Sequence, residues 1–392
     1  MVAEQIQSRK AELARNIATS AGIPISHAMA ELDSFGYFHS NVDRLLAARN
    51  GQVTPSLTEE RVGILMPENA PILYYFAASR VLNSSHKVDF KPKNTRTDPV
   101  IGDVLDIYGG AFGGDRINMV RFQTPDGEPT PQQTTEFFGN HRLVYIFTAS
   151  FVAKAISSTL DPQSAGKLVP FVEGNSTTYI HRDADVPRAA QMANTSSTWA
   201  NGQYCKNCGV ETVHRDVFES YLSERQRVND AVVIGEPTDE AADIVHLDAA
   251  HIATRRNLLQ EAANYGLEVL PTKRGYPYLI VARGGLKGLP DQLLGEFNIP
   301  GAILVQVDDE KEALSIIEKR GSATLRGRIL ELGIAGGEST AAYFRDKGIA
   351  AAVHKPYEPT TVPDIFGRHD YDPRTRLGHW LMPIFSDGKV YD

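Results

Sequence analysis

The chain has 392 residues, of which 42% are hydrophobic and 22% charged, a composition typical of a globular protein of two or three domains. Its formal net charge of −8 is spread along the chain, so nothing indicates a nucleic acid or an anionic membrane as partner. No apolar run approaches the roughly 20 residues that span a bilayer, and the polar N-terminus is unlike a signal peptide. Two cysteines three positions apart make no disulfide framework, so we expect a reducing, cytoplasmic location.

The first half of the chain alternates between segments typical of helices and of strands. Residues 3–50 predict amphipathic helices that break near residues 22–24 and again at Gly36. Apolar runs predict strands at residues 61–66, 87–92 and 142–147 and helices at residues 72–82 and 151–160. The glycine-rich stretch at residues 108–115 is expected to form a turn. Repeated strand–turn–helix units predict a parallel sheet with helices on both faces, whose ligands bind beyond the carboxyl ends of the strands.

The second half of the chain repeats this alternation. Strands are predicted at residues 168–172, 178–181 and 302–307, helices at residues 185–200 and 310–320, and a strand leading into a helix at residues 210–218. The helix at residues 310–320 carries paired charges, which favour a solvated face, and Gly321 is a typical stop signal. These elements place the boundary between two α/β domains near residues 166–171. The sequence contains no internal repeat and no low-complexity segment.

Cys205 is the strongest candidate for chemistry. It ends the segment Asn-Gly-Gln-Tyr-Cys, where small and polar neighbours predict an accessible sulfur in a loop between elements. A thiolate is the nucleophile of such a site, and its pKa falls when helix-end amides or cations face it. Two alternatives stay open: an inert buried cysteine, or a Cys-x-x-Cys pair with Cys208 that forms a redox couple or half of a zinc site. Because a zinc site usually needs four ligands, we expect no metal centre here.

Six motifs, in order and at near-family spacing, resemble those of the aldehyde dehydrogenase superfamily. The first three are the strand and turn at residues 62–71, Phe-Lys-Pro at residues 90–92 and Phe-Thr-Ala-Ser at residues 147–150. The others are His-Arg-Asp-Ala-Asp at residues 181–185, Gly-Gln-Tyr-Cys at residues 202–205 and Glu-Phe-Asn-Ile-Pro at residues 296–300, followed by a strand and an acidic run. The similarity extends, with gaps, from Val62 to Gly367.

The resemblance implies an α/β fold of aldehyde dehydrogenase type, with a Rossmann-like cofactor domain, an α/β catalytic domain and a short oligomerisation tail. The expected boundaries are residues 1–168 for the nicotinamide-cofactor domain, whose N-terminal helical part is truncated, residues 169–370 for the catalytic cysteine domain and residues 371–392 for the tail. In the family an apolar tail of this kind pairs with a neighbouring subunit by adding a strand to a sheet edge. We therefore expect a homodimer or a homotetramer. Folding of the tail back on its own core is the alternative.

The resemblance also implies catalytic roles. Cys205 would form a covalent thiohemiacetal or thioester, and the Asn69 amide with the backbone N–H of Cys205 would stabilise the oxyanion, a contribution of about 10²–10³-fold in rate. Hydrolytic members carry a general-base glutamate upstream of the cysteine, and that position is Phe171 here. The sequence at residues 171–176 is instead similar to that of CoA-acylating dehydrogenases and acyl-CoA reductases. Glu173 is the remaining candidate for a general base.

A nicotinamide cofactor, NADP or NAD, is implied in the same way. Lys91 would hold the adenine-side ribose, Ser150 would meet the pyrophosphate at a helix N-terminus, and Glu296 would hold the nicotinamide ribose. Pro67 belongs to the turn after the first strand, and Asn94 stands where NAD-preferring members often have a glutamate. An acidic group at that position would repel a 2′-phosphate, whereas the neighbours here are basic, which favours NADP.

A thioester on Cys205 needs a base to activate water for hydrolysis, and without one it survives for transfer to a thiol. The predicted function is therefore an NAD(P)H-dependent reductase that interconverts an acyl thioester and an aldehyde, with CoA or an acyl carrier as the thiol partner. The first alternative is a hydrolytic NAD(P)-dependent aldehyde dehydrogenase that makes a carboxylic acid. The second is a catalytically silent binding subunit.

Two other enzyme classes are disfavoured. The stretch at residues 329–340 resembles the first glycine-rich loop of S-adenosylmethionine-dependent methyltransferases, but too few residues follow for further strand–helix units of roughly 30 residues each. No Gly-x-Ser-x-Gly elbow of a serine hydrolase occurs. The histidines His181, His214 and His369 are expected to be surface or structural residues.

Overall fold

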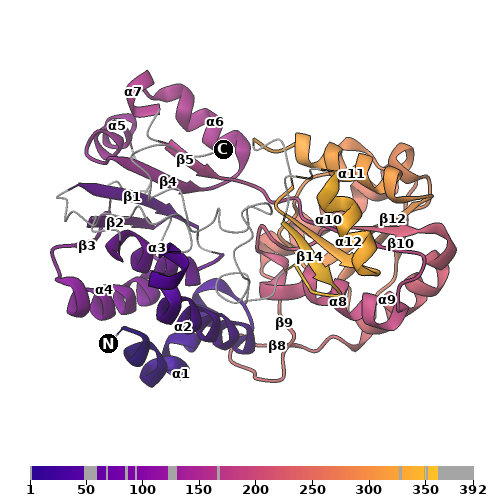
Figure 1. Ribbon diagram of the computed structural model, residues 1–392, viewed down its shortest axis with the longest axis horizontal. Helices are drawn as coiled ribbons and strands as arrows, with labels where there is room; N and C mark the ends of the chain where they lie inside the picture. Colours follow the sequence, from indigo (N-terminus) through magenta and orange to yellow (C-terminus); the bar gives the residue numbers. More distant parts are fainter. Residues whose placement is uncertain are drawn as a thin grey trace. The chain divides into compact units, whose positions relative to one another are not determined.

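Figure 1 shows a computed structural model of the chain, which describes residues 2–47, 60–67, 69–83, 87–92, 95–121, 130–165, 168–325, 329–347, 349 and 352–360. The chain divides between Val172 and Glu173 into two compact units, and each is described by itself. No helix within these ranges is both long enough and apolar enough to cross a membrane. Asn94, His369 and the expected tail at residues 371–392 lie outside the described residues.

The first unit is built on a parallel five-stranded sheet with the strand order β3-β2-β1-β4-β5. Its strands are β1 (Arg61–Met66), β2 (Lys87–Pro92), β3 (Ile117–Met119), β4 (Leu143–Phe147) and β5 (Leu168–Phe171). Central strands of a parallel sheet are covered on both faces, and accordingly Val62, Ile64 and Val144 are buried. The chain runs from β1 out to β3 and returns on the other side of β1. A topological switch point therefore lies between β1 and β4.

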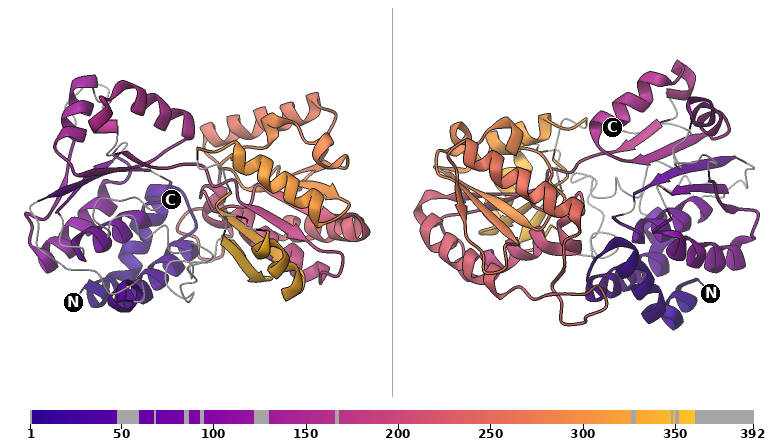
Figure 2. Two further views of the ribbon diagram at one scale, coloured as in Figure 1. Left: turned by 45° about the horizontal axis from the view of Figure 1, so that its top comes forward. Right: turned by 180° about the vertical axis from the view of Figure 1, so that it is seen from behind.

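Helices lie on both sides of this sheet, as Figures 1 and 2 show. They are α1 (Val2–Ala21), α2 (Ile25–Ala47), α3 (Ile72–Asn83), α4 (Asp98–Phe112), α5 (Pro131–Gly139), α6 (Ser150–Thr159) and α7 (Pro162–Ala165). Helices α1 to α4 gather on one side, where α1 contacts α2 and α4, and α3 contacts α4. Helices α5 to α7 lie on the other side. The predicted α/β arrangement is confirmed.

Two predictions about glycines in this unit are wrong. Helix α2 continues through Gly36 instead of breaking there, and the expected turn at residues 108–115 is helical until Gly113, with φ +100°, ends α4. A glycine in a helix interior costs only about 1 kcal/mol. Burial of Phe35 and of Tyr108 outweighs that cost, because burying one large apolar side chain contributes roughly 1.5–3 kcal/mol.

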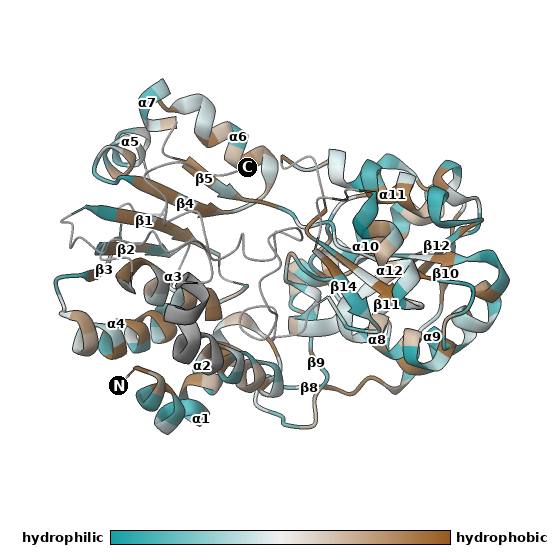
Figure 3. Ribbon diagram, in the orientation of Figure 1, coloured by the Kyte–Doolittle hydropathy of each residue, from teal (hydrophilic) through white to brown (hydrophobic). Residues whose placement is uncertain are grey.

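The second unit contains a seven-stranded sheet with the order β10-β11-β12-β7-β6-β13-β14, in which only the β10–β11 pair is antiparallel. Its strands are β6 (Thr177–Ile180), β7 (Val210–His214), β10 (Glu268–Leu270), β11 (Tyr278–Ala282), β12 (Gly301–Val307), β13 (Glu331–Ala335) and β14 (Ala352–Pro356). A separate parallel pair is formed by β8 (Ile234–Gly235) and β9 (Ile244–Val245). The strands of both sheets are mostly hydrophobic, whereas the helices are mixed (Figure 3).

Two apolar cores cover the faces of the seven-stranded sheet. On one face lie α8 (Val186–Thr198) and α9 (Phe218–Ala231), and on the other lie α10 (Ala249–Asn264), α11 (Glu310–Ser322) and α12 (Glu338–Asp346). Side chains of β6 alternate between the cores, since Ile180 joins the first and Tyr179 the second. The strand bounds match the sequence predictions closely because buried parallel strands are short apolar runs.

Candidate active site

Cys205 lies at the end of a backbone segment with an unusual conformation. Between α8 and β7, the short 3-10 turn η1 (Trp199–Gly202) contains three consecutive left-handed residues, Ala200 (φ +46°), Asn201 (φ +59°) and Gly202 (φ +72°). We call residues 199–205 the nucleophile loop. A left-handed residue other than glycine costs of order 1–2 kcal/mol, so other contacts must hold this loop.

Two asparagine side chains supply contacts of this kind. Asn201 forms a pair of hydrogen bonds with the backbone of Val245, accepting from its N–H at 2.8 Å and donating to its carbonyl at 3.2 Å. Asn207 accepts from the N–H of Tyr204 at 2.8 Å, and its amide nitrogen donates to the carbonyl of Trp199 at 3.0 Å. Amide side chains can hydrogen-bond as a backbone group does, so these two fix the loop without regular secondary structure.

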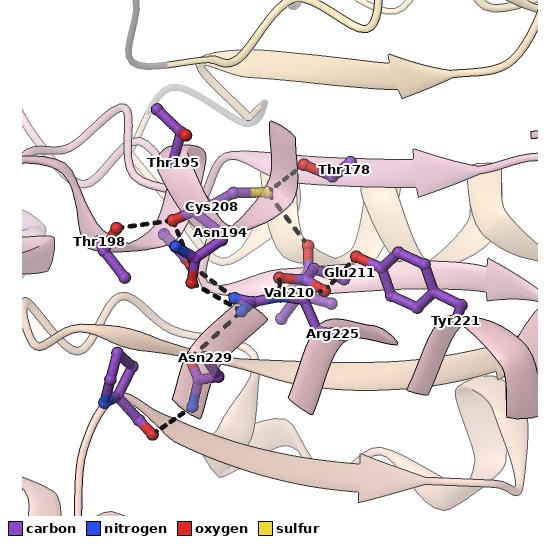
Figure 4. A network of polar contacts seen from close by, with 12 residues as sticks. Thr178, Asn194, Thr195, Thr198, Cys208, Val210, Glu211, Tyr221, Arg225 and Asn229 are labelled. Atoms are coloured by element: carbon purple, nitrogen blue, oxygen red, sulfur yellow. Dashed lines mark hydrogen bonds and ion pairs between the residues drawn. The ribbon is translucent and has the colours of Figure 1, made fainter. Parts of the chain in front are cut away.

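The two cysteines differ in environment. Both are free thiols, but Cys205 is half-buried and Cys208 is fully buried. The Cys208 sulfur lies 2.8 Å from the Thr178 hydroxyl and 3.3 Å from the Val210 carbonyl (Figure 4). Burial raises the pKa of the Cys208 thiol to about 12, which keeps it protonated. Cys208 is therefore a structural thiol, and Cys205 remains the candidate nucleophile.

Glu296 lies against the segment that precedes β6. Its Oε2 accepts a hydrogen bond from the N–H of Gly174 at 2.8 Å. The hydrogen-bonding groups around Asn298 fix the orientation of its side-chain amide. In that orientation the Asn298 amide nitrogen donates to Glu296 Oε1 at 2.7 Å and to the Gln203 carbonyl at 3.2 Å. The side chain keeps some exposure, but protein surrounds the carboxylate. This burial, together with the charge of neighbouring Glu173, raises the pKa of Glu296 to about 7.

Gly174 contacts the carbonyl of Cys205 so closely that no side chain fits. A Cβ atom at this position would lie 1.7 Å from the Cys205 carbonyl oxygen and 2.7 Å from its carbonyl carbon. The hydroxyl of Ser176 also donates to the Cys205 carbonyl, at 3.4 Å. Glu173, Glu296 and Cys205 are thereby brought together around residues 174–177, which we call the 174–177 turn.

Arg320 is buried beneath the same turn. Its guanidinium donates to the carbonyls of Asn175 and Leu294 at 3.2 and 2.7 Å and to the Thr177 hydroxyl at 3.1 Å. Burial lowers the pKa of Arg320 to about 10. The prediction of a solvated face for this helix is thus wrong at its last turn, because Arg320 points inward and is fully buried. Hydrogen bonds to backbone oxygens leave no pattern in the sequence that would have revealed this.

The other predicted site residues lie at the carboxyl ends of strands in the first unit. Pro67 and Asn69 follow β1, Lys91 lies near the end of β2, and Ser150 is the first residue of α6, directly after β4. Ala149 is the N-cap of α6, and within the described chain no side chain caps this helix. Its first amides can therefore face an anion such as a pyrophosphate, and the switch point between β1 and β4 is where such folds bind dinucleotides. Of these residues, Pro67, Lys91 and Ser150 are the ones predicted to contact a nicotinamide dinucleotide.

A buried polar network links strand β7 to helices α8 and α9 (Figure 4). Arg225 forms a fully buried ion pair with Glu211 at 3.1 Å. It also donates to the side chains of Asn194 and Ser197 of α8, at 2.9 and 2.8 Å. The Tyr221 hydroxyl donates to the second Glu211 oxygen at 2.7 Å. The sequence analysis did not identify this network, which joins β7 to α8 and α9 on one face of the sheet.

Known proteins share this sequence pattern. Residues 138–278 match the family model described as Aldehyde dehydrogenase family. The chain is 23% identical over 338 residues to a lactaldehyde dehydrogenase of Methanococcus maripaludis, which covers 80% of this chain and 70% of that protein. It is 31% identical over 70 residues to a 3-sulfolactaldehyde dehydrogenase of Priestia megaterium, which covers 18% of this chain and 15% of that protein.

Solved structures share the fold. Lactaldehyde dehydrogenase from Escherichia coli superposes with a TM-score of 0.73 at 17% identity, covering 91% of this chain and 77% of that chain. The NADP-dependent glyceraldehyde-3-phosphate dehydrogenase from Bacillus halodurans, solved with NADP, has a TM-score of 0.74 at 15% identity and covers 91% of this chain and 76% of that chain. The predicted fold of aldehyde dehydrogenase type is confirmed.

Proposed function

Since the chain belongs to the aldehyde dehydrogenase superfamily and is an NAD(P)-dependent oxidoreductase, we propose that it interconverts an aldehyde and an acyl thioester through Cys205. We assign nicotinamide binding to residues 1–168 and acyl chemistry to residues 169–370. In that assignment Asn69 donates to the oxyanion, while Pro67, Lys91, Asn94 and Ser150 contact the cofactor. The thiol partner is CoA or an acyl carrier, and the assembly is a homodimer or homotetramer.

The chemistry centres on one sulfur atom. The Cys205 thiolate attacks the carbonyl carbon of the aldehyde, which forms a C–S bond and places negative charge on the oxygen. The bound nicotinamide supplies a hydride acceptor, or a hydride donor in the reverse direction. Cys205 then carries the acyl group as a thioester and leaves as a thiolate when an external thiol takes that group. The contacts at the Tyr204 N–H and at the Cys205 carbonyl fix the backbone that carries this sulfur.

The observation that carries the proposal is the side chain at position 171. Phe171 closes β5, and its ring stacks on Phe147 at 4.7 Å and on Tyr145 at 5.7 Å between centroids. The resemblance assigns the general base of hydrolytic members to this sequence position, and here the position holds an aromatic residue instead of a carboxylate. Without that base, transfer of the acyl group to a thiol is favoured over hydrolysis.

Hydrolytic oxidation is the second candidate, and a different observation favours it. Burial raises the pKa of the Glu296 carboxyl to about 7, which is in the range suited to a general base that accepts a proton from water near neutral pH. Glu173 lies beside it. Lactaldehyde dehydrogenases are also among the relatives that the sequence matches.

Assays in both directions separate the two candidates. The protein is incubated with acetyl-CoA and NADPH or NADH, and separately with lactaldehyde and NADP⁺ or NAD⁺ with and without CoA, while nicotinamide absorbance is followed. We expect acetyl-CoA alone to drive cofactor oxidation, and lactaldehyde oxidation to require CoA and yield an acyl-CoA. Free acid formed without any thiol would replace the thioester proposal with the hydrolytic one.

Substitution of the cysteines tests the nucleophile itself. Cys205→Ser should lower the rate in either direction by at least about 10³-fold, because no thioester can then form. Cys208→Ser is the matched control and should keep most of the activity, since its thiol is protonated and enclosed. Equal losses in the two variants, or none in Cys205→Ser, would show that Cys205 is not the nucleophile.

A further inference from the structure

We propose that Glu296 is a positioning residue for Cys205 that acts through Gly174, a role that rests on Cys205 being the nucleophile. The resemblance assigns Glu296 to the nicotinamide ribose instead. In the structure, both carboxylate oxygens have partners within the second unit, the Gly174 N–H at 2.8 Å and the Asn298 amide at 2.7 Å. Each partner also contacts the nucleophile loop, so Glu296 joins two supports of that loop.

The first support is the segment from Glu296 to Pro300. Gly202 of the nucleophile loop packs on its backbone, and a Cβ on Gly202 would lie 2.4–2.6 Å from atoms of Ile299 and Pro300. Asn298, itself left-handed with φ +52°, donates to the Gln203 carbonyl at 3.2 Å. This segment therefore holds the middle of the loop, two and three residues before Cys205.

The second support is the 174–177 turn. Gly174 makes the close contact with the Cys205 carbonyl described above, and Ser176 donates to that carbonyl at 3.4 Å. The Gly174 N–H points away from the turn to Glu296, while its own carbonyl accepts from Leu330 N–H at 2.6 Å. Fixing both peptide groups of Gly174 fixes its Cα atom, and with it the position of the Cys205 carbonyl.

The buried Arg320 restrains the 174–177 turn by hydrogen bonds. Its three nitrogens donate to oxygens of residues 175, 176 and 177 and to the carbonyl of Leu294. Among the described residues, the hydrogen-bond acceptors of this buried cation are neutral oxygens. Glu296 is the carboxylate that lowers the energetic cost of burying it, since its charge favours the ionised guanidinium. A cation and an anion thus both bind the 174–177 turn, which contacts the Cys205 carbonyl.

The strength of the hydrogen bond between Glu296 and the Gly174 N–H should depend on pH. Burial and the charge of Glu173 raise the pKa of Glu296 to about 7, while the N–H groups of Gly174 and Asn175 and the charge of Arg320 act in the opposite direction. Above that pH the carboxylate is ionised and accepts more strongly from Gly174, because hydrogen bonds to ionised acceptors are the stronger ones. Below it the bond weakens, and the support of Cys205 loosens.

Alkylation of the free enzyme by iodoacetamide tests the proposal without substrate or cofactor. The rate at Cys205 is followed by peptide mass from about pH 5.5 to about pH 9 in wild type, Glu296→Gln, Glu296→Leu and the exposed control Glu318→Gln. We expect wild type and the control to show an inflection near the pKa of about 7 in addition to thiol ionisation. Glu296→Gln keeps an acceptor for Gly174, so it should lose the inflection but stay within about threefold of the wild-type rate at high pH.

Glu296→Leu removes the acceptor and should lower the rate at Cys205 about tenfold across the whole range, with circular dichroism confirming that it folds. An unchanged alkylation profile in both variants would overturn the proposal. An increase in the KM for NAD(P), with the alkylation profile unchanged, would return Glu296 to the ribose role. If instead Cys205 in wild type is labelled no faster than Cys208, the proposed function fails and not this inference alone.

Discussion

The nucleophile loop and the network around Arg225 both use polar side chains, but these side chains bind different kinds of groups. In the loop, Asn201 and Asn207 bind backbone N–H and carbonyl groups. In the network, Arg225, Glu211 and their neighbours bind one another (Figure 4). Bonds from side chain to backbone hold an unfavourable chain conformation in place. Bonds between side chains instead lock β7, α8 and α9 together. We therefore expect changes in the loop to affect reactivity and changes in the network to affect stability.

Removing one member of the network should have the largest effect on stability. Arg225→Met would leave the fully buried Glu211 carboxylate without its cation, which typically costs 3–5 kcal/mol, so we expect about 3–5 kcal/mol lower stability toward urea. Arg227→Met is the matched control on the same helix. Its ion pair with Glu224 is two-thirds exposed at the arginine side chain, so the loss should stay below about 1 kcal/mol. Similar unfolding midpoints for the two variants would contradict the structural role of Arg225.

A methyl group added beneath the loop should change reactivity more than stability. In Gly174→Ala the new Cβ would meet the Cys205 carbonyl at 1.7 Å, so the loop must shift. A displacement of about 1 Å at a reacting group can cost about 10²-fold, and we expect alkylation of Cys205 and turnover to fall about tenfold or more. Gly209→Ala is the control, because its Cβ would meet only an Arg320 nitrogen at 3.9 Å. Wild-type alkylation rates in Gly174→Ala would remove this glycine from the loop's support.

The difference between these two regions also explains what the sequence could predict. The strands were predictable because a buried parallel strand is a short apolar run, as in the segment Ala302–Val307. Cys205 was predictable because glycine and small polar neighbours mark its loop. The contacts of Arg320 were not, because it reaches across the fold to backbone oxygens of residues 175 and 176, and any residue supplies a backbone oxygen. The assignments of Asn69 and Lys91 to the active site remain predictions.

Glycine was misleading where packing outweighed propensity. Gly36 and the pair at residues 109–110 lie inside helices, although local preference favours a break or a turn. Helix α4 itself was not predicted, because it contains one proline and three glycines, at positions 102, 109 and 110. The proline lies in the first turn, where a helix tolerates it. Whether such a segment is helical depends on the apolar surface against which it packs. A local sequence pattern does not contain that surface.

A buried histidine far from the loop predicts how stability depends on pH. Burial alone would lower the pKa of His354, but its contacts with the carboxylates of Glu331 at 2.9 Å and Glu358 at 3.5 Å outweigh burial and raise it to about 9. A raised histidine pKa contributes stability that is complete below the unfolded value of about 6.5 and is lost as pH rises through about 9. We expect a loss of about 3 kcal/mol across this window, measured by urea unfolding at several pH values. In His354→Gln the slope should flatten, whereas His251→Gln should keep it.

The Glu296 carboxyl acts in the same direction over a lower window. Its pKa rises from the ordinary 4.5 to about 7, so the folded state binds more protons between these values and stability falls as pH rises through them. Loss of stability confined to this lower window would assign the pH dependence to Glu296 and not to His354.

The smallest expected effect is that of Gly110→Ala, which serves as a comparison for Gly174→Ala. Gly110 lies in α4, and an added Cβ would have no described atom within 4 Å. Alanine loses less conformational freedom than glycine on folding, so Gly110→Ala should raise the free energy of unfolding by about 0.5–1 kcal/mol without changing the rate of Cys205 alkylation. Gly113→Ala is the control at the end of the same helix, where φ of +100° makes any side chain strained, and it should lower stability. If Gly110→Ala slowed Cys205 as much as Gly174→Ala does, the loss in the latter would reflect general disturbance of the fold. If the Cβ of Gly174→Ala displaces the loop locally, only that variant should slow the alkylation of Cys205.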